Sequence, residues 1–183
     1  MSTTIKLNEE GLINIKDVDS SIKLDIRYAS SDNITGKVLY SKPLCFLKEE
    51  VAEKLSLVQK QLKKEDLTLV IWDGYRPLRI QKFIWEAFPN PKYNAKISNH
   101  NKGIAVDLTL GDKDGNLLLM PTDLDVFSEK SHHGYDNLPE EVIRNRNKLK
   151  SVMEKNGFES FEFEWWHYSY PRLFNAKVLD IPI

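Results

Sequence analysis

Apolar residues recur at helical spacing in three segments of the chain. Between positions 48 and 62 they return every three or four residues, with lysine, glutamate and glutamine in the gaps, which predicts an amphipathic helix. A second helix is expected from Pro77, which suits the first helical position, to Ala87. A third is expected over 140–156, with Gly157 as its C-cap.

Three other segments carry the patterns of strands. Residues 67–72 form a short, nearly continuous apolar run, as in a buried strand. Residues 104–110 alternate, so that Asp107 lies on the face opposite Val106. Residues 161–170 are rich in aromatics and predict a final strand. Helices and strands are mixed without a regular βαβ rhythm, which indicates an α+β fold with helices packed on a largely antiparallel sheet.

The length of the chain, 183 residues, is enough for one domain with a substantial core. No internal repeat or linker divides it. We therefore expect a single domain over residues 1–183, with residues 1–20 as an N-terminal extension to the core.

Composition excludes several classes of function. Hydrophobic residues make up 41% and charged residues 29%, and a net charge of −1 gives no electrostatic drive toward nucleic acid or an anionic membrane. The single cysteine, Cys45, rules out a disulfide within the chain and a cysteine-rich zinc site. No run approaches the roughly 18 apolar residues of a membrane span. Residues 1–10 lack the apolar stretch of a signal peptide, so a cytoplasmic location is expected.

Two short segments hold side chains suited to a metal site. Glu164 stands three residues before His167, with two tryptophans between them, and His100 precedes Asp107 upstream. Together they offer two imidazoles and one carboxylate for a metal, plus a second carboxylate to act as a base. That is the ligand count of a catalytic zinc site with one position left for water. The patterns alone also fit a solvent-facing Asp107 and an edge strand whose Glu164 faces water.

The spacing of Glu164 and His167 sets a geometric requirement. Positions three apart in a regular strand face opposite sides of the sheet. Both side chains can reach one site only if the strand ends, twists or bulges between them. An irregularity near Trp165 or Trp166 is therefore predicted.

Two further features have both a functional and a structural interpretation. Arg76 stands between a predicted strand and a predicted helix, where the backbone is rigid and the side-chain tip is open. A guanidinium there can bind an oxyanion through two donors, or it can serve as a structural partner of Asp73. The adjacent His132 and His133 lie in a polar segment, where a solvated pair is a commoner outcome than a metal site.

Several short segments follow one another in a specific order along the chain. They are Arg27-Tyr28-Ala29, Asp32-Asn33-Ile34-Thr35-Gly36, Trp72-Asp73-Gly74-Tyr75-Arg76-Pro77, Ser98-Asn99-His100, Asp107-Leu108-Thr109-Leu110, Met120-Pro121-Thr122-Asp123-Leu124-Asp125, Ser131-His132-His133, Asn145-Arg146, Gly157-Phe158 and Glu164-Trp165-Trp166-His167-Tyr168. In this order the chain resembles the D-alanyl-D-alanine dipeptidases of the VanX type, a branch of the zinc D,D-peptidases (peptidase family M15, subfamily D).

The resemblance implies a hedgehog/D,D-peptidase-like zinc fold and hydrolysis of D-alanyl-D-alanine to two D-alanines. His100, Asp107 and His167 would be the ligands of one Zn²⁺ per chain. Glu164 would be the general base for a metal-activated water, and Arg76 would stabilise the transition state.

The resemblance also implies where the substrate binds. Tyr28, Ser98 and Asp125 would lie where the family recognises the amino end of the dipeptide, with Asp123 as a rival to Asp125. Pro121 stands where the family usually has glycine. The connector between Arg76 and His100 is shorter than in the best-known members, and this region would shape either the pocket rim or a dimer contact.

Other functions stay open on the sequence alone. They are a zinc D,D-carboxypeptidase acting on longer cell-wall peptides, a non-catalytic zinc-binding domain of the same fold, and an α+β domain without metal. Two histidines and a carboxylate also bind other divalent ions, so zinc is taken as the default metal and is not deduced from these residues. The expected partner is a small D,D-dipeptide, with neither nucleic acid nor membrane, and a homo-oligomer is left open.

Overall fold

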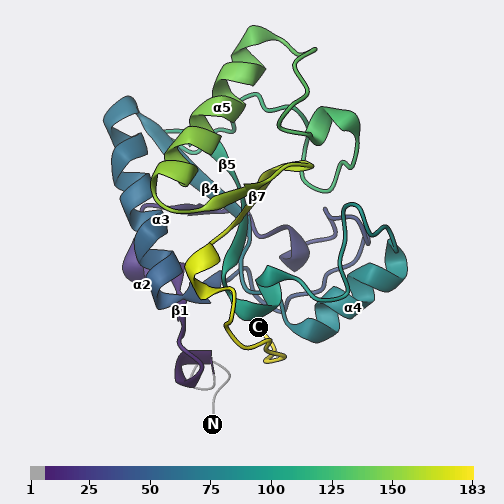
Figure 1. Ribbon diagram of the computed structural model, residues 1–183. Helices are drawn as coiled ribbons and strands as arrows, with labels where there is room; N and C mark the ends of the chain where they lie inside the picture. The colour runs from purple at the N-terminus through teal and green to yellow at the C-terminus, as the bar shows by residue number, and fades with distance from the viewer. Residues whose placement is uncertain (1–6) are drawn as a thin grey trace.

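A five-stranded sheet forms the centre of the computed structural model, which describes residues 7–183 (Figure 1). Its strands run in the order β2 (Lys23–Leu24), β4 (Leu67–Asp73), β5 (Ala105–Asp112), β7 (Glu164–Ser169) and β6 (Glu159–Phe161). β2 is parallel to β4, and every other neighbouring pair is antiparallel. The predicted α+β class with a largely antiparallel sheet is confirmed.

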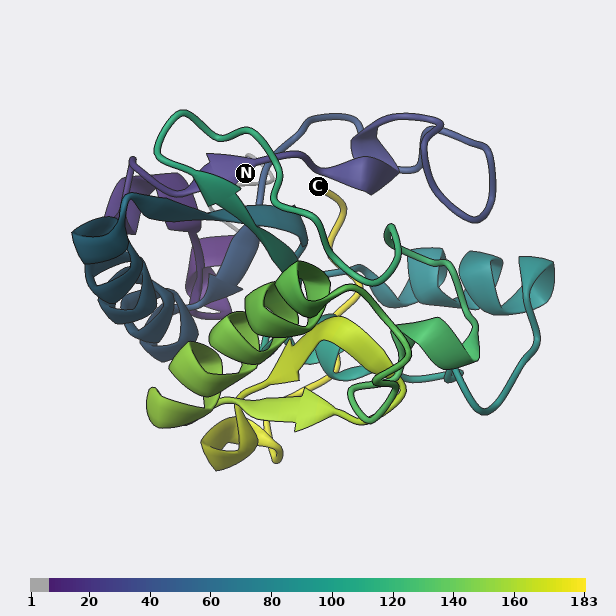
Figure 2. The same cartoon turned by 90° about the horizontal axis from the view of Figure 1, so that it is seen from above.

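Two long helices, α3 (Glu49–Leu62) and α5 (Glu140–Lys155), pack against each other and against strands of the sheet. α4 (Leu78–Ala87) lies on the far side of the molecule from α3 (Figures 1 and 2). In β5, Val106, Leu108 and Leu110 are fully buried in the main core. Asp107 points to the other face of this strand, as the alternation predicts, and lines a pocket.

The beginning of the described chain packs onto this core. β1 (Leu12–Asn14) pairs with β3 (Phe46–Lys48) in a small antiparallel sheet, and α2 (Ile15–Val18) follows directly. Leu12 and Ile15 are completely buried. The described part of the expected N-terminal extension is therefore packed into the domain.

Three expected boundaries differ from the structure. The aromatic segment 161–170 is not one strand, because β6 ends at Phe161 and β7 begins at Glu164 after a turn. Pro77 has an extended backbone and precedes α4 instead of starting it. Asn156 is the C-cap of α5, and Gly157 follows it with φ +91°, a conformation that favours glycine.

Within residues 7–183, the helices are too short or too polar to cross a bilayer.

Candidate functional site

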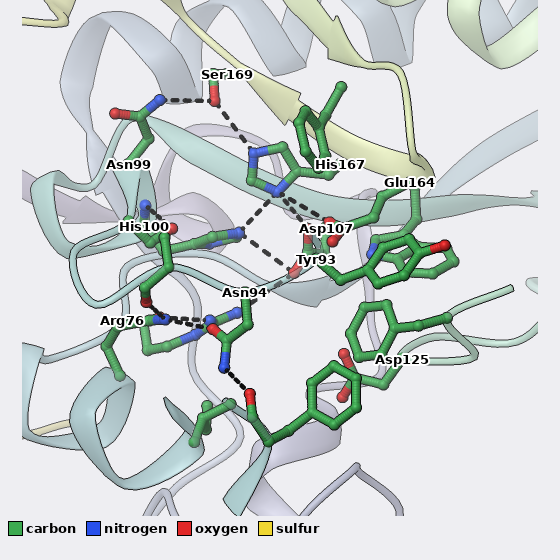
Figure 3. Close-up of a pocket in the computed structure, with 18 of the residues that line it drawn as sticks. Arg76, Tyr93, Asn94, Asn99, His100, Asp107, Asp125, Glu164, His167 and Ser169 are labelled. Carbon is green, nitrogen blue, oxygen red and sulfur yellow. Dashed lines mark hydrogen bonds and ion pairs between the residues drawn. The ribbon is translucent and has the colours of Figure 1, made fainter. Parts of the chain in front are cut away.

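A pocket of about 400 Å³ opens between the sheet, α4 and the segment that connects α4 to β5 (Figure 3). All the site residues that the sequence singles out line it: Tyr28, Arg76, Ser98, His100, Asp107, Asp125, Glu164 and His167. The fold thus brings together residues that are spread over most of the chain.

Three side chains converge at the base of the pocket. His100 Nε2 lies 3.2 Å from His167 Nδ1, and His167 Nδ1 lies 3.0 Å from Asp107 Oδ1. His100 Nε2 is also 3.3 Å from Asp107 Oδ2. Among the residues that the structure describes, these three form the group whose ligand atoms all lie within 4.8 Å of one another. Two imidazole nitrogens and a carboxylate oxygen are the donors of a catalytic zinc site.

Asp107 of β5 pairs directly with His167 of β7, and the strand pairing is irregular on the outer side of each of these two strands. In β4, Ile71 pairs with Leu108 but Asp73 pairs with Asp107, so Trp72 is an extra residue. On the far side of β7, Ser160 of β6 pairs with Tyr168, but the next residue, Phe161, pairs with Glu164.

Three residues of β7 therefore stand between these two pairs, and the irregularity predicted near Trp165 or Trp166 is confirmed. Glu164 and Trp166 line the pocket, and so do His167 and Ser169. The side-chain alternation thus shifts between Trp166 and His167, which lets Glu164 and His167 share one site.

Each imidazole directs one nitrogen toward the other ligand atoms and its second nitrogen toward a hydrogen-bond partner. His100 Nδ1 lies 2.7 Å from the carbonyl oxygen of Gly74, which can only accept, so this nitrogen carries the proton and Nε2 is free to bind a metal. His167 Nε2 lies 3.2 Å from the hydroxyl of Ser169, and its Nδ1 faces the other ligand atoms. This donor set fits a divalent metal such as zinc.

Gly74 is required by close packing beside His100. A Cβ atom at this position would lie 2.6 Å from Cys45 Sγ and 3.0 Å from the carbonyl oxygen of Phe46. Only glycine lets β3 approach this turn, and the turn presents its carbonyl to His100.

Burial and nearby charges together shift the pKa values of the two buried carboxylates, Asp107 and Glu164, in opposite directions. Burial alone raises the pKa of Asp107, but His100 and His167 outweigh it and hold that pKa well below its usual range. Burial raises the pKa of Glu164 well above its usual value, and the nearby charges of Asp107 and Asp125 raise it further. Glu164 Oε2 lies 3.9 Å from His167 Nδ1, beside the converging ligand atoms but outside their group.

Both interpretations of Arg76, structural and functional, agree with the structure, because the side chain bonds to Asp73 and also lines the pocket. Its Nε donates to Asp73 Oδ2 at 2.8 Å and its NH1 donates to Gln81 Oε1 at 2.7 Å. Its NH2 reaches Asp107 Oδ2 at 3.5 Å, and the side chain lines the pocket. Arg76 is thus a structural partner of Asp73 and also a cation facing the site. Sequence reasoning did not identify Gln81, which lies on the inner face of α4.

The structure distinguishes Asp125 from Asp123. Tyr28 donates its hydroxyl to Asp125 Oδ2 at 3.2 Å, and both residues line the pocket. Asp123 is exposed and pairs with Arg27, 3.1 Å from NH2. Asp125 has φ 59°, an uncommon backbone conformation for a residue other than glycine. Burial raises its pKa to about 6.

Ser98 caps the short helix that carries His100. Its hydroxyl accepts a hydrogen bond from the backbone N–H of His100 at 3.2 Å, and the backbone N–H of Ser98 donates to Asn101 Oδ1 at 2.7 Å. Ser98 is on the pocket wall, so it can also donate its hydroxyl proton to a ligand.

Aromatic rings form another wall of the pocket. Phe127 stacks between Phe88 and Tyr93, with centroid distances of 4.9 and 5.1 Å. The Tyr93 hydroxyl lies 3.0 Å from His132 Nε2, which ties this wall to the loop before α5. His132 and its neighbour His133 lie outside the group of convergent ligand atoms.

His133 is expected to make stability pH-dependent. It is 9% exposed, and within residues 7–183 neither ring nitrogen has a hydrogen-bond partner. Burial, with the charges of Lys150 and Arg146, lowers its pKa from 6.5 to about 4. Between these values the unfolded chain binds a proton that the folded chain does not, so stability is lost as pH falls.

From pH 7 to pH 5 this single group should lower the free energy of unfolding by about 2 kcal/mol. Urea unfolding of the wild type and of the His133→Gln variant at both pH values measures the effect. The variant should lose less stability than the wild type over this range. Equal losses in the two proteins would contradict the role of His133.

Comparison with known proteins gives consistent matches over almost the whole chain. Residues 8–181 match the Peptidase M15 family model, described as D-ala-D-ala dipeptidase. The D-alanyl-D-alanine dipeptidase of Escherichia coli (strain K12) is 35% identical over 171 residues, covering 92% of this chain and 89% of that protein. The protein of the same name from Enterococcus faecium is 33% identical over 184 residues, covering 87% and 91%. That of Enterococcus faecalis is 32% identical over 198 residues, covering 95% and 94%.

Proposed function

Because the chain belongs to the Peptidase M15 family of D-alanyl-D-alanine dipeptidases and is thus a peptidase, we propose that it hydrolyses D-alanyl-D-alanine with a zinc ion held by His100, Asp107 and His167. One observation carries the proposal. Three ligand atoms converge within 4.8 Å in a pocket that also holds a buried glutamate with a raised pKa. A cytoplasmic location stays a prediction from the sequence.

The residues of the pocket divide the work of hydrolysis. A bound zinc ion would polarise the peptide carbonyl and lower the pKa of a water to about 7. Glu164 accepts the proton of the attacking water and passes it to the leaving amine. Its raised pKa makes it a stronger base and lets it hold the proton between these two transfers.

Arg76 stabilises the negative charge that develops on the carbonyl oxygen. Its bonds to Asp73 and Gln81 hold the guanidinium beside Asp107, at the metal end of the pocket. A donor held in place before the reaction needs no rearrangement when the charge appears. The ion pair with Asp73 is therefore part of the catalytic arrangement.

Asp125 binds the free ammonium group of the dipeptide. Its carboxylate faces the pocket, and Tyr28 and the backbone N–H of Ile34 both donate to Oδ2, at 3.2 and 3.3 Å. These two bonds orient the carboxylate, whereas the carboxylate of Asp123 is directed to Arg27.

The Asp125→Asn variant should therefore bind the dipeptide more weakly. Loss of a hydrogen bond between charged groups predicts a fall of about 10–100-fold in kcat/KM, most of it as a rise in KM. Asparagine tolerates a positive φ, so the backbone can stay as it is. Steady-state kinetics with D-alanyl-D-alanine measures the change.

Asp123→Asn is the matched control, because it removes the neighbouring carboxylate that faces Arg27. Its KM should stay close to the wild-type value. An unchanged KM in Asp125→Asn, or a larger rise in Asp123→Asn, would exclude Asp125 as the ammonium site.

The substrate class is tested by comparing two peptides on the zinc-loaded protein. Free D-alanyl-D-alanine should be hydrolysed much faster than an N-acetylated tripeptide that ends in the same pair, because only the dipeptide brings an ammonium group to Asp125. The reverse preference would favour the carboxypeptidase alternative. Bound metal without turnover of either peptide would favour a non-catalytic zinc-binding domain, and metal analysis that finds no ion would refute the zinc site.

A further inference from the structure

In each histidine, the ring nitrogen that faces away from the ligand group has a different kind of hydrogen-bond partner. His100 Nδ1 donates to the main-chain carbonyl of Gly74 at 2.7 Å, and this acceptor does not depend on a side chain. His167 Nε2 lies 3.2 Å from Ser169 Oγ, so its hydrogen-bond partner is a side chain (Figure 3). Ser169 shares the face of His167 because it follows two positions later in β7.

Ser169 is held rigidly by the sheet and by a second side chain. Its backbone lies between β5 and β6, paired with Ala105 on one side and Glu159 on the other, and the residue is 6% exposed. Asn99, the neighbour of His100 in the chain, donates from Nδ2 to Ser169 Oγ at 3.2 Å. The Asn99–Ser169 contact therefore connects the two chain segments that carry the histidines.

The contacts of Ser169 allow the tautomer of His167 that metal binding would need. A hydroxyl oxygen has two lone pairs, so Ser169 can accept from Asn99 and from His167 Nε2–H at the same time. With the proton on Nε2, Nδ1 keeps its lone pair, and Nδ1 is the nitrogen that lies 3.0 Å from Asp107 Oδ1. A partner of this kind fixes both the ring orientation and the tautomer of a metal-binding histidine.

We propose that Ser169, oriented by Asn99, is a positioning residue that holds His167 in the Nε2–H tautomer for metal binding. The inference rests on the proposed zinc site. It adds two residues that sequence reasoning did not identify. A small hydroxyl in a buried, aromatic-rich strand, two positions after a histidine, is the signal that could have indicated Ser169.

Zinc affinity of the purified full chain, measured by competition with a chromophoric chelator, tests the proposal. Ser169→Ala should weaken zinc binding about 10–100-fold. Ser169→Thr keeps the hydroxyl and should restore most of the affinity. Ser56→Ala removes another buried hydroxyl, bonded to Asp19 and outside the pocket, and should leave zinc binding unchanged.

A substitution of Asn99 tests the same contact without changing a residue of the sheet. Asn99→Ala should weaken zinc binding less than Ser169→Ala does. The double variant should match Ser169→Ala, because Asn99 acts through the serine.

Three outcomes would overturn the inference: unchanged affinity in Ser169→Ala, an equal loss in Ser169→Thr, or additive losses in the double variant. A wild-type chain that binds no zinc would instead overturn the proposed function, and the inference with it.

Discussion

Replacing Glu164 by glutamine is expected to lower kcat for D-alanyl-D-alanine by about 10²–10⁴-fold while zinc stays bound. Glutamine keeps the size of the side chain but cannot accept the proton of the attacking water. Glu164 lies outside the group of converging ligand atoms, so its replacement should leave them in place. Steady-state kinetics and metal analysis on the same sample measure both parts of the result.

Glu162→Gln is the matched control for Glu164→Gln. Glu162 is exposed in the turn before β7, so the substitution makes the same change of charge without touching the pocket. It should retain wild-type turnover. Near-native turnover in Glu164→Gln would refute its role as the base, and loss of zinc there would place this carboxylate among the ligands.

Replacing His167 by alanine is expected to remove both the zinc and the activity. The substitution leaves one imidazole and one carboxylate, from His100 and Asp107, at the base of the pocket. Loss of a group that only orients a ligand costs 10–100-fold in affinity, so loss of the ligand itself should weaken binding by more than about 100-fold. Metal content after dialysis and turnover of the dipeptide check the expectation.

His132→Ala separates this effect from the simple loss of an imidazole. His132 lies outside the ligand group, and its Nε2 contacts the hydroxyl of Tyr93. This variant should keep one zinc per chain. Stoichiometric zinc in His167→Ala would remove His167 from the ligand set.

The helices could be predicted from the sequence because each one carries its apolar residues along one face. An apolar stripe with a period of 3.6 residues is a local property, and α3, α4 and α5 all show it. The final hairpin could not be predicted in the same way. Phe161 and Phe163 flank Glu162 without a glycine, proline or asparagine to mark the turn, so the two strands resemble one.

The candidate site was only partly predictable. The residue types suited to zinc, proton transfer and oxyanion binding can be recognised along the chain, and the structure places them in one pocket. Asp73 was foreseen as a possible partner of Arg76, but Gln81 and Asn99 were not. The bonds from Arg76 to Gln81 and from Asn99 to Ser169 each join groups that lie in different elements.

The sequence by itself determined the three long helices, the central strands β4 and β5, and which side chains are available for chemistry. Only the tertiary structure decided how they meet. Asp107 and His167 are far apart in the chain, and their side chains come within 3.0 Å because β5 pairs with β7 at these two residues. The irregular pairing of β7 then brings Glu164 to the same side. Strand register depends on how both strands pack against the rest of the core, and neither segment contains that information alone.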